Sequence, residues 1–72
     1  MGDILEAFGR NVRRLRLELG LTQEELAERA GLNLTDVGRV ERARRDPGIR
    51  VVVKLADGLG VPVAKLFEGI GH

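Results

Sequence analysis

Apolar and polar positions alternate with a helical rhythm in the first 20 residues. Apolar residues recur at three- and four-residue steps, at Ile4, Leu5, Phe8, Val12, Leu15 and Leu19. This spacing predicts an amphipathic helix over residues 3 to 19, which Gly20 ends.

A second helix is predicted by its start signal. Thr22 begins a Thr-Gln-Glu-Glu sequence, in which the Thr22 hydroxyl and the Glu25 carboxylate can each bind an otherwise unpaired backbone N–H. This capping box predicts a helix from Gln23 to Ala30. Gly31 suits the left-handed residue that terminates it.

Apolar periodicity resumes almost at once, at Leu34, Val37 and Val40. Asn33 can cap a third helix, over residues 34 to about 42. Two short helices joined by about three residues that include a glycine have the helix-turn-helix spacing, in which the second helix stands out from the domain.

The second half of the chain starts with a strong break at Asp46-Pro47-Gly48. A fourth helix ending near Gly60 is predicted by the apolar residues Ile49, Val52, Val53, Leu55, Ala56 and Leu59. The β-branched run at 51–53 also fits a strand, but the chain offers no partner strand. Pro62 suits the first turn of a short fifth helix with Val63, Leu66 and Phe67, and residues 69 to 72 are predicted to be a frayed tail.

The length predicts a single domain over residues 1–72, and the helical periodicity predicts that it is all-α. The chain is 43% hydrophobic and 32% charged, which favours a folded protein over a disordered one. It has no cysteine, so its small core has no disulfide to support it, and self-association would help. No stretch suits a membrane span or a secretion signal, and we expect a cytoplasmic protein.

Charge is segregated along the chain. Residues 39–50 carry five arginines against Glu41 and Asp46, whereas residues 18–29 carry four glutamates against Arg29. A basic zone beside a helix-turn-helix favours DNA as the partner.

The chain offers no residues suited to catalysis. His72, the only histidine, is terminal, so neither a zinc site nor a catalytic triad is expected. No strand precedes Gly58 and Gly60, which are better explained by helix ends and packing than by a nucleotide loop. We expect no enzyme activity, no cofactor and no metal.

The stretch from Phe8 to Phe67 resembles the phage-repressor-like (Cro/repressor or XRE-type) helix-turn-helix family. The resemblance is carried by the ordered motifs Arg-x-Leu-Arg, Gly-Leu-Thr-Gln-Glu-Glu-Leu-Ala, Ala-Gly-Leu, Val-Gly-Arg-Val-Glu, Arg-x-x-Pro and Leu-Ala-x-Gly-Leu-Gly-Val. In length the chain looks most like small stand-alone regulators, including restriction-modification controller proteins and single-domain phage repressors.

Two residues bear on this pattern. Ala43 stands where the family usually has a glycine after the third helix, which implies either a strained left-handed residue or a different turn. Gly38 lies inside the third helix, where the family often has a small residue, and this implies a packing requirement that offsets its cost of about 1 kcal/mol.

The resemblance implies that the third helix enters the major groove of DNA. The side chains implied to contact bases are Asn33, Leu34, Thr35, Asp36 and Arg39. Arg39 is the strongest candidate because arginine can donate two hydrogen bonds to guanine. Asp36 can accept a hydrogen bond from cytosine, or it can instead cap the start of its own helix.

Phosphate contacts are predicted at the N-terminus of the second helix and in the arginine-rich zone. The residues are Gln23, Arg42, Arg44, Arg45, Arg10 and Arg13, and for the last two a purely solubilising role is an equal alternative. The resemblance also implies a structural ion pair between Arg16 and Glu41.

Repressor-like domains usually bind two half-sites, so the resemblance implies a homodimer. We predict an interface on the fourth and fifth helices formed by Val51, Val61, Val63, Leu66, Phe67 and Ile70; the alternative is that most of these complete the core. The predicted function is that of an operator-binding transcriptional regulator. The alternative is a protein-interaction or antitoxin-like module with a protein partner and only secondary DNA binding.

Overall fold

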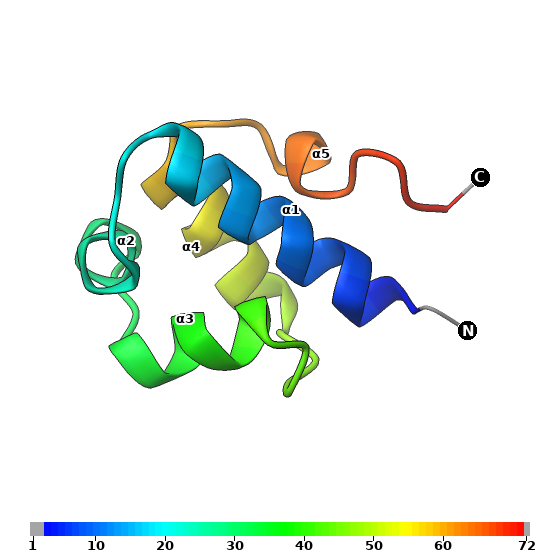
Figure 1. Ribbon diagram of the computed structural model, residues 1–72, viewed down its shortest axis with the longest axis horizontal. Coiled ribbons are helices and arrows are strands. Elements are labelled where there is room, and N and C mark those ends of the chain that lie inside the picture. Colours follow the sequence, from blue (N-terminus) through cyan, green and yellow to red (C-terminus); the bar gives the residue numbers. More distant parts are fainter. Residues whose placement is uncertain (1–2, 72) are drawn as a thin grey trace.

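Five helices make up most of the computed structural model, which describes residues 3–71 (Figure 1). They are α1 (Ile4–Glu18), α2 (Gln23–Ala30), α3 (Leu34–Glu41), α4 (Ile49–Leu59) and α5 (Val63–Leu66). No strand occurs among the described residues, so the all-helical prediction is confirmed, and the run at 51–53 lies within α4. No helix in the described part of the chain is long and apolar enough to cross a membrane.

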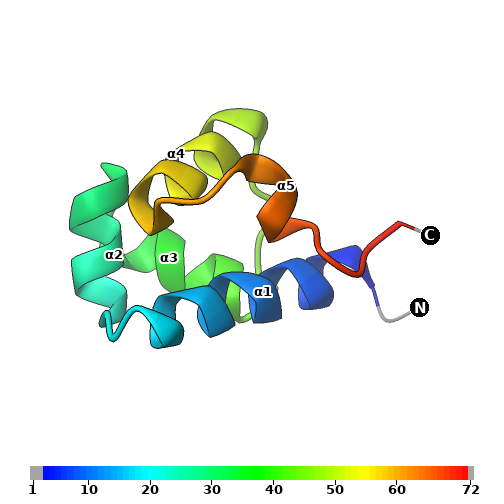
Figure 2. The same ribbon diagram turned by 90° about the horizontal axis from the view of Figure 1, so that it is seen from above.

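The helices enclose one core. α1 packs against α3, and α2 packs against both α3 and α4. Figure 2 shows α1 and α4 on opposite sides of the molecule, with α2 near one end and α5 near the other. The buried apolar side chains are Phe8, Val12, Leu15, Leu26, Ala27, Ala30, Val37, Val40, Leu55, Ala56, Leu59 and Leu66.

α1, α2, α3 and α4 are each followed by a residue with left-handed backbone. Three of these residues are the glycines Gly20, Gly31 and Gly60, each with φ of 71°. The fourth is Ala43, with φ of 57°, and the N–H of Arg44 closes the turn by donating to the carbonyl of Arg39 at 2.8 Å. The turn after α3 is therefore built as the other three are, with an alanine in a conformation that costs about 1 kcal/mol.

The end of the chain is tied to α1 by a side chain that sequence analysis did not single out. The Asn11 amide donates to the carbonyl oxygens of Leu66 at 2.8 Å and Glu68 at 3.0 Å. Beyond them Ile70 is half-buried and packs against the core. The prediction of a frayed tail is therefore wrong for Ile70, and His72 lies outside the described residues.

Two glycines allow helices to approach closely. A methyl group on Gly9 of α1 would lie 2.5 Å from the carbonyl oxygen of Val40 in α3. One on Gly58 of α4 would lie 2.9 Å from Cβ of Ala30 in α2, which confirms a packing role there. At Gly38 the nearest atoms belong to the mobile guanidinium of Arg42, at 3.1 Å. The packing requirement expected at Gly38 is therefore found instead at Gly9, which the sequence did not reveal.

This difference gives a paired prediction. Gly9→Ala should lower the free energy of unfolding by about 1–3 kcal/mol, because α1 and α3 must separate. Gly38→Ala should be neutral or stabilising by up to about 1 kcal/mol, because the gain in helix propensity meets only a flexible side chain. Urea denaturation followed by circular dichroism measures both. Equal losses for the two variants would contradict the assignment of the close contact to Gly9.

Candidate nucleic-acid interface

The segment from α2 to α3 is shaped by three local devices. The Thr22 hydroxyl accepts from the Glu25 N–H at 3.0 Å while the Glu25 carboxylate accepts from the Thr22 N–H at 2.8 Å, so the predicted capping box is confirmed. Gly31 takes the left-handed turn. Asn33 Oδ1 accepts from the Asp36 N–H at 2.8 Å and caps α3. These bonds define the start of α3 and leave its first turn at the surface.

The exposed face of α3 carries three of the five side chains predicted to contact bases. Leu34 is 47% exposed, and Thr35 and Arg39 are exposed beside it. The side chains of Asn33 and Asp36 are engaged within the protein, the first as the cap and the second in an ion pair with Arg45 at 2.7 Å. The Asp36 carboxylate does not cap its own helix.

The turn that follows α3 continues this face as a basic surface. Arg42, Arg44 and Arg45 are all exposed. The guanidinium of Arg42 lies over Gly38, back along α3. A positive surface next to an exposed helix start suits the phosphate backbone of a nucleic acid.

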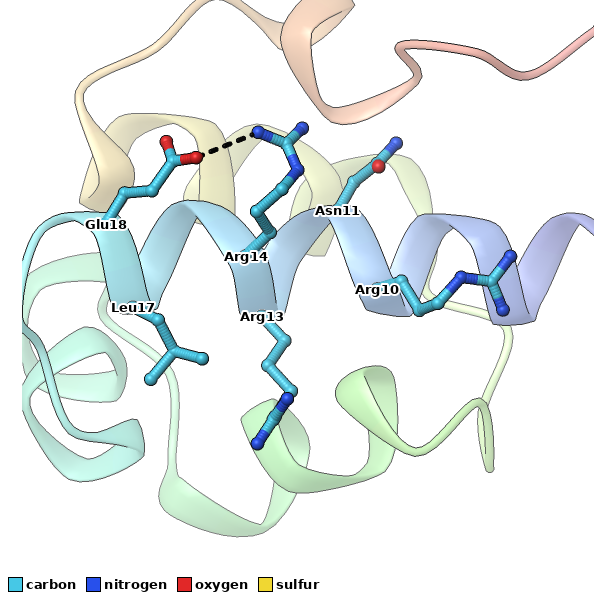
Figure 3. Close-up of a pocket in the computed structure, with 6 residues that line it drawn as sticks. All are labelled: Arg10, Asn11, Arg13, Arg14, Leu17 and Glu18. Carbon is cyan, nitrogen blue, oxygen red and sulfur yellow. Dashed lines mark hydrogen bonds and ion pairs between the residues drawn. The ribbon is translucent and has the colours of Figure 1, made fainter.

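Three arginines of α1 point in different directions (Figure 3). Arg14 points toward the chain that follows α5, where it pairs with Glu68 at 3.4 Å, and it also pairs with Glu18 at 3.2 Å. Arg13 points the opposite way, and Arg10 extends along the helix. The hollow drawn in Figure 3 is lined by residues of α1 alone, so it is open helix surface. Arg10 and Arg13 are exposed and make no ion pair within residues 3–71.

A buried ion pair joins α1 to the end of α3. Arg16 of α1 donates from Nε to Glu41 Oε2 at 2.6 Å and from Nη2 to Oε1 at 3.0 Å, so the ion pair that the resemblance implied is present. The third nitrogen, Nη1, donates to the carbonyl of Leu21 at 2.8 Å. The two side chains are only 9% and 2% exposed. The hydrogen bond that Arg16 donates to Glu41 raises the pKa of Arg16, burial lowers it, and the negative charge of Glu41 raises it further.

Gln23 belongs to the same cluster. Its Nε2 donates to Glu41 Oε1 at 3.0 Å, and its side chain is half-buried. Glu41 therefore links α3 both to α1 and to the start of α2. The sequence pattern placed Gln23 only against a phosphate; the bond to Glu41 is a long-range contact that no local signal indicates.

A separate apolar groove lies between the starts of α1 and α4 and the helix α5. It is lined by Ile4, Leu5, Phe8, Asp46, Pro47, Ile49, Val52, Val53, Val63 and Phe67. Ile49 is 83% exposed and Ile4 is 63% exposed, far more than a core residue would be.

Only part of the predicted dimer surface lies in this groove. Val63 and Phe67 are there and are exposed. Val51, Val61 and Ile70 are half-buried and pack against the core. Leu66 is fully buried, so its placement at an interface is wrong: it completes the core, the alternative that the sequence left open.

A tight turn between α2 and α3, an exposed first turn of α3 and a basic turn after it define a helix-turn-helix DNA-binding protein. The chain belongs to the HTH_3 (XRE-type) helix-turn-helix family, which matches residues 12–66. The protein is a DNA-binding transcriptional regulator and not an enzyme.

Other regulators are similar to this chain over most of its length. Control protein C.SmaI of Serratia marcescens is 42% identical over 69 residues, which cover 96% of this chain and 82% of the relative. The HTH-type transcriptional regulator y4dJ of Sinorhizobium fredii is 41% identical over 64 residues, 89% of this chain and 83% of that one. The crystal structure of the restriction-modification controller protein C.AhdI from Aeromonas hydrophila superposes with a TM-score of 0.86 at 41% identity, covering 88% of this chain and 96% of that chain.

Burial of the Arg16–Glu41 pair predicts that removing one partner costs more stability than removing both. Arg16→Met should lower the free energy of unfolding by about 3 kcal/mol, because it leaves the Glu41 carboxylate buried without its cation. The double variant Arg16→Met/Glu41→Leu should recover much of this loss, since no lone charge remains. Urea denaturation followed by circular dichroism gives both values.

The exposed pair on α1 provides the control. Arg14→Met removes an arginine from the same helix, but its partners are solvated, and the expected loss is below about 1 kcal/mol. A loss at Arg16 no larger than the loss at Arg14 would show that the buried pair is not structural.

Proposed function

We propose that this protein binds a specific double-stranded DNA operator as a homodimer, with α3 of each protomer in the major groove, and regulates transcription by occupying that site. The exposed first turn of α3, with Leu34, Thr35 and Arg39 beside a basic turn, is the observation that carries this proposal. Similarity to controller proteins such as C.SmaI and C.AhdI supports it. Such a regulator acts where the DNA is, which we expect to be the cytoplasm.

The side chains of α3 suit different parts of a base pair. Arg39 can donate two hydrogen bonds to O6 and N7 of guanine, and Leu34 can contact a thymine methyl group. Thr35, at the same end of α3, can bond to several bases. Asn33 caps α3 through Oδ1, which leaves its amide N–H groups for a nearby base or phosphate.

Backbone phosphates of the DNA on either side of the contacted bases are assigned to Arg42 and Arg44 and to the N-terminus of α2. There Gln23 keeps one amide N–H beyond the one that it donates to Glu41. Its backbone N–H points the same way as the helix dipole, which favours an anion. Arg10 and Arg13 extend the basic surface along α1.

The apolar groove is the surface that we assign to the second copy. Ile4, Ile49, Val53, Val63 and Phe67 lie together and are exposed. The protomer measures 31 × 21 × 21 Å, so a twofold pair is of a size to place two recognition helices about 34 Å apart, one helical turn of DNA. The revised interface retains Val63 and Phe67 of the sequence-based set.

Selection of DNA from a random duplex library tests operator binding. We expect an inverted repeat with half-sites about 10 base pairs apart, bound at least ~1,000-fold more tightly than random duplex. Four arginines on each protomer, Arg10, Arg13, Arg42 and Arg44, make eight phosphate contacts in a dimer and predict a slope near −7 in log affinity against log salt. Anisotropy of labelled DNA measures both quantities.

Weak binding without sequence preference would overturn the operator proposal. It would favour the alternative, a protein-interaction or antitoxin-like module. A slope near −4 with a single half-site would show that the protein binds DNA as a monomer.

The dimer surface has its own test. Val53→Glu places a charge in the lining of the groove and should weaken self-association at least ~10-fold, because burying an unpaired carboxylate is costly. Leu17→Glu is the control, since Leu17 is 50% exposed on α1 and lies outside the groove. Sedimentation equilibrium measures association, and circular dichroism checks the fold. Equal association of the two variants would exclude the groove as the interface.

A further inference from the structure

One arginine of the basic turn differs from its neighbours. Arg45 Nη1 donates to Asp36 Oδ1 at 2.7 Å, across nine residues of sequence. The pair connects the turn that follows α3 to the first turn of the same helix. Within residues 3–71, Arg39, Arg42 and Arg44 have no carboxylate partner.

The pair lies beside the proposed base-contacting face. Thr35 and Arg39 are four residues apart and share the outer face of α3, and Asp36 follows Thr35 on the flank of that face. Asp36 is 20% exposed and Arg45 is 42% exposed. The carboxylate is therefore partly covered, while the guanidinium bound to it is more exposed.

The ion pair with Asp36 uses only part of the hydrogen-bonding capacity of Arg45. A guanidinium has five N–H donors, and only Nη1 is used by Asp36. The edge formed by Nε and Nη2 remains available as a fork of two donors. That fork matches O6 and N7 of guanine. A guanidinium fixed in place loses less side-chain entropy when it binds than a free one does.

We propose that Arg45 reads a guanine in the operator and that Asp36 is a positioning residue that orients it. The sequence pattern instead placed Arg45 on a phosphate and left Asp36 either on a base or as a cap of its own helix. A carboxylate already bound to an arginine is a poor acceptor for cytosine, and an unpaired one would repel the DNA backbone. This inference rests on the proposed operator binding and adds a specificity-determining residue to it.

The test repeats the selection from random duplex DNA with four variants. Arg45→Ala removes the guanidinium, and Arg45→Lys retains the charge but not the fork. Asp36→Asn removes the carboxylate charge at nearly constant shape and leaves the Asn33 cap, which binds only the backbone N–H of residue 36. Arg44→Ala is the matched control, because it removes an exposed arginine one position away.

Both Arg45 variants should lose preference for guanine at one position of each half-site, by about 10- to 100-fold. Arg44→Ala should weaken binding to all sequences alike and reduce the salt slope, with base preferences unchanged. Asp36→Asn should lose part of the same guanine preference while binding random duplex as tightly as the parent or more tightly. A purely structural role for Asp36 would lower both kinds of binding together.

The possible results distinguish a failure of the proposed function from a failure of this inference alone. If the parent protein selects no sequence, the proposed function fails and this inference fails with it. If the parent selects an operator but the Arg45 variants behave as Arg44→Ala does, Arg45 is a phosphate contact and only this inference is overturned. If Asp36→Asn keeps the full guanine preference, Asp36 does not position Arg45. Thermal melts of each variant identify any that fails to fold, and Arg45→Lys, which retains the cation beside Asp36, then carries the decision.

Discussion

The ion pair between Arg16 and Glu41 is the interaction on which the position of α3 depends. It joins α1 to the last turn of α3 through two hydrogen bonds, and the same carboxylate accepts from Gln23 at the start of α2. The remaining guanidinium nitrogen binds the carbonyl of Leu21, just before α2. One buried cluster therefore holds three helices in fixed relation, including both helices of the helix-turn-helix.

A buried ion pair is seldom the most stabilising solution, because desolvation of two charges offsets their attraction. Two apolar side chains would fill the same space, but they would not fix the orientation of α3 relative to α1. The fork of Arg16 meets both oxygens of Glu41, which restricts the rotation of α3 more than a packing contact does. Gly9 allows this arrangement, since the backbones of α1 and α3 approach too closely there for a side chain. Orientation of α3 determines which of its side chains face outward, and so the pair links stability to recognition.

The sequence predicted the features that depend on local signals. The caps at Thr22 and Asn33 and the glycine at position 31 act within four residues, and the helices they bound were predicted to within about one residue. Contacts between distant residues were harder to predict. Asn11 binds carbonyls 55 and 57 residues away, and neither composition nor periodicity indicates this.

The same distinction between local signals and contacts of distant residues applies to the candidate site. Exposure of Thr35 and Arg39 follows from helical periodicity, whereas exposure of Leu34, which shares the apolar periodicity of Val37 and Val40, does not. The pairing of Asp36 with Arg45 depends on how the turn after α3 folds back. Burial of Leu66 depends on how α5 packs against the other helices. An apolar residue in a four-residue helix has too little periodicity around it to distinguish core from surface.

The basic and apolar surfaces occupy different parts of the chain, and this separation has a consequence for regulation. The residues proposed to contact bases lie on α3 and the turn after it, whereas the apolar groove is formed by α1, α4, α5 and the residues before α4. In the proposed dimer, both surfaces are used at once without competing. Dimerisation then doubles the number of phosphate contacts, so operator affinity rises steeply with assembly. Because the dimer concentration varies with the square of the monomer concentration when monomers predominate, occupancy of the operator responds more sharply to protein level than a monomeric domain allows.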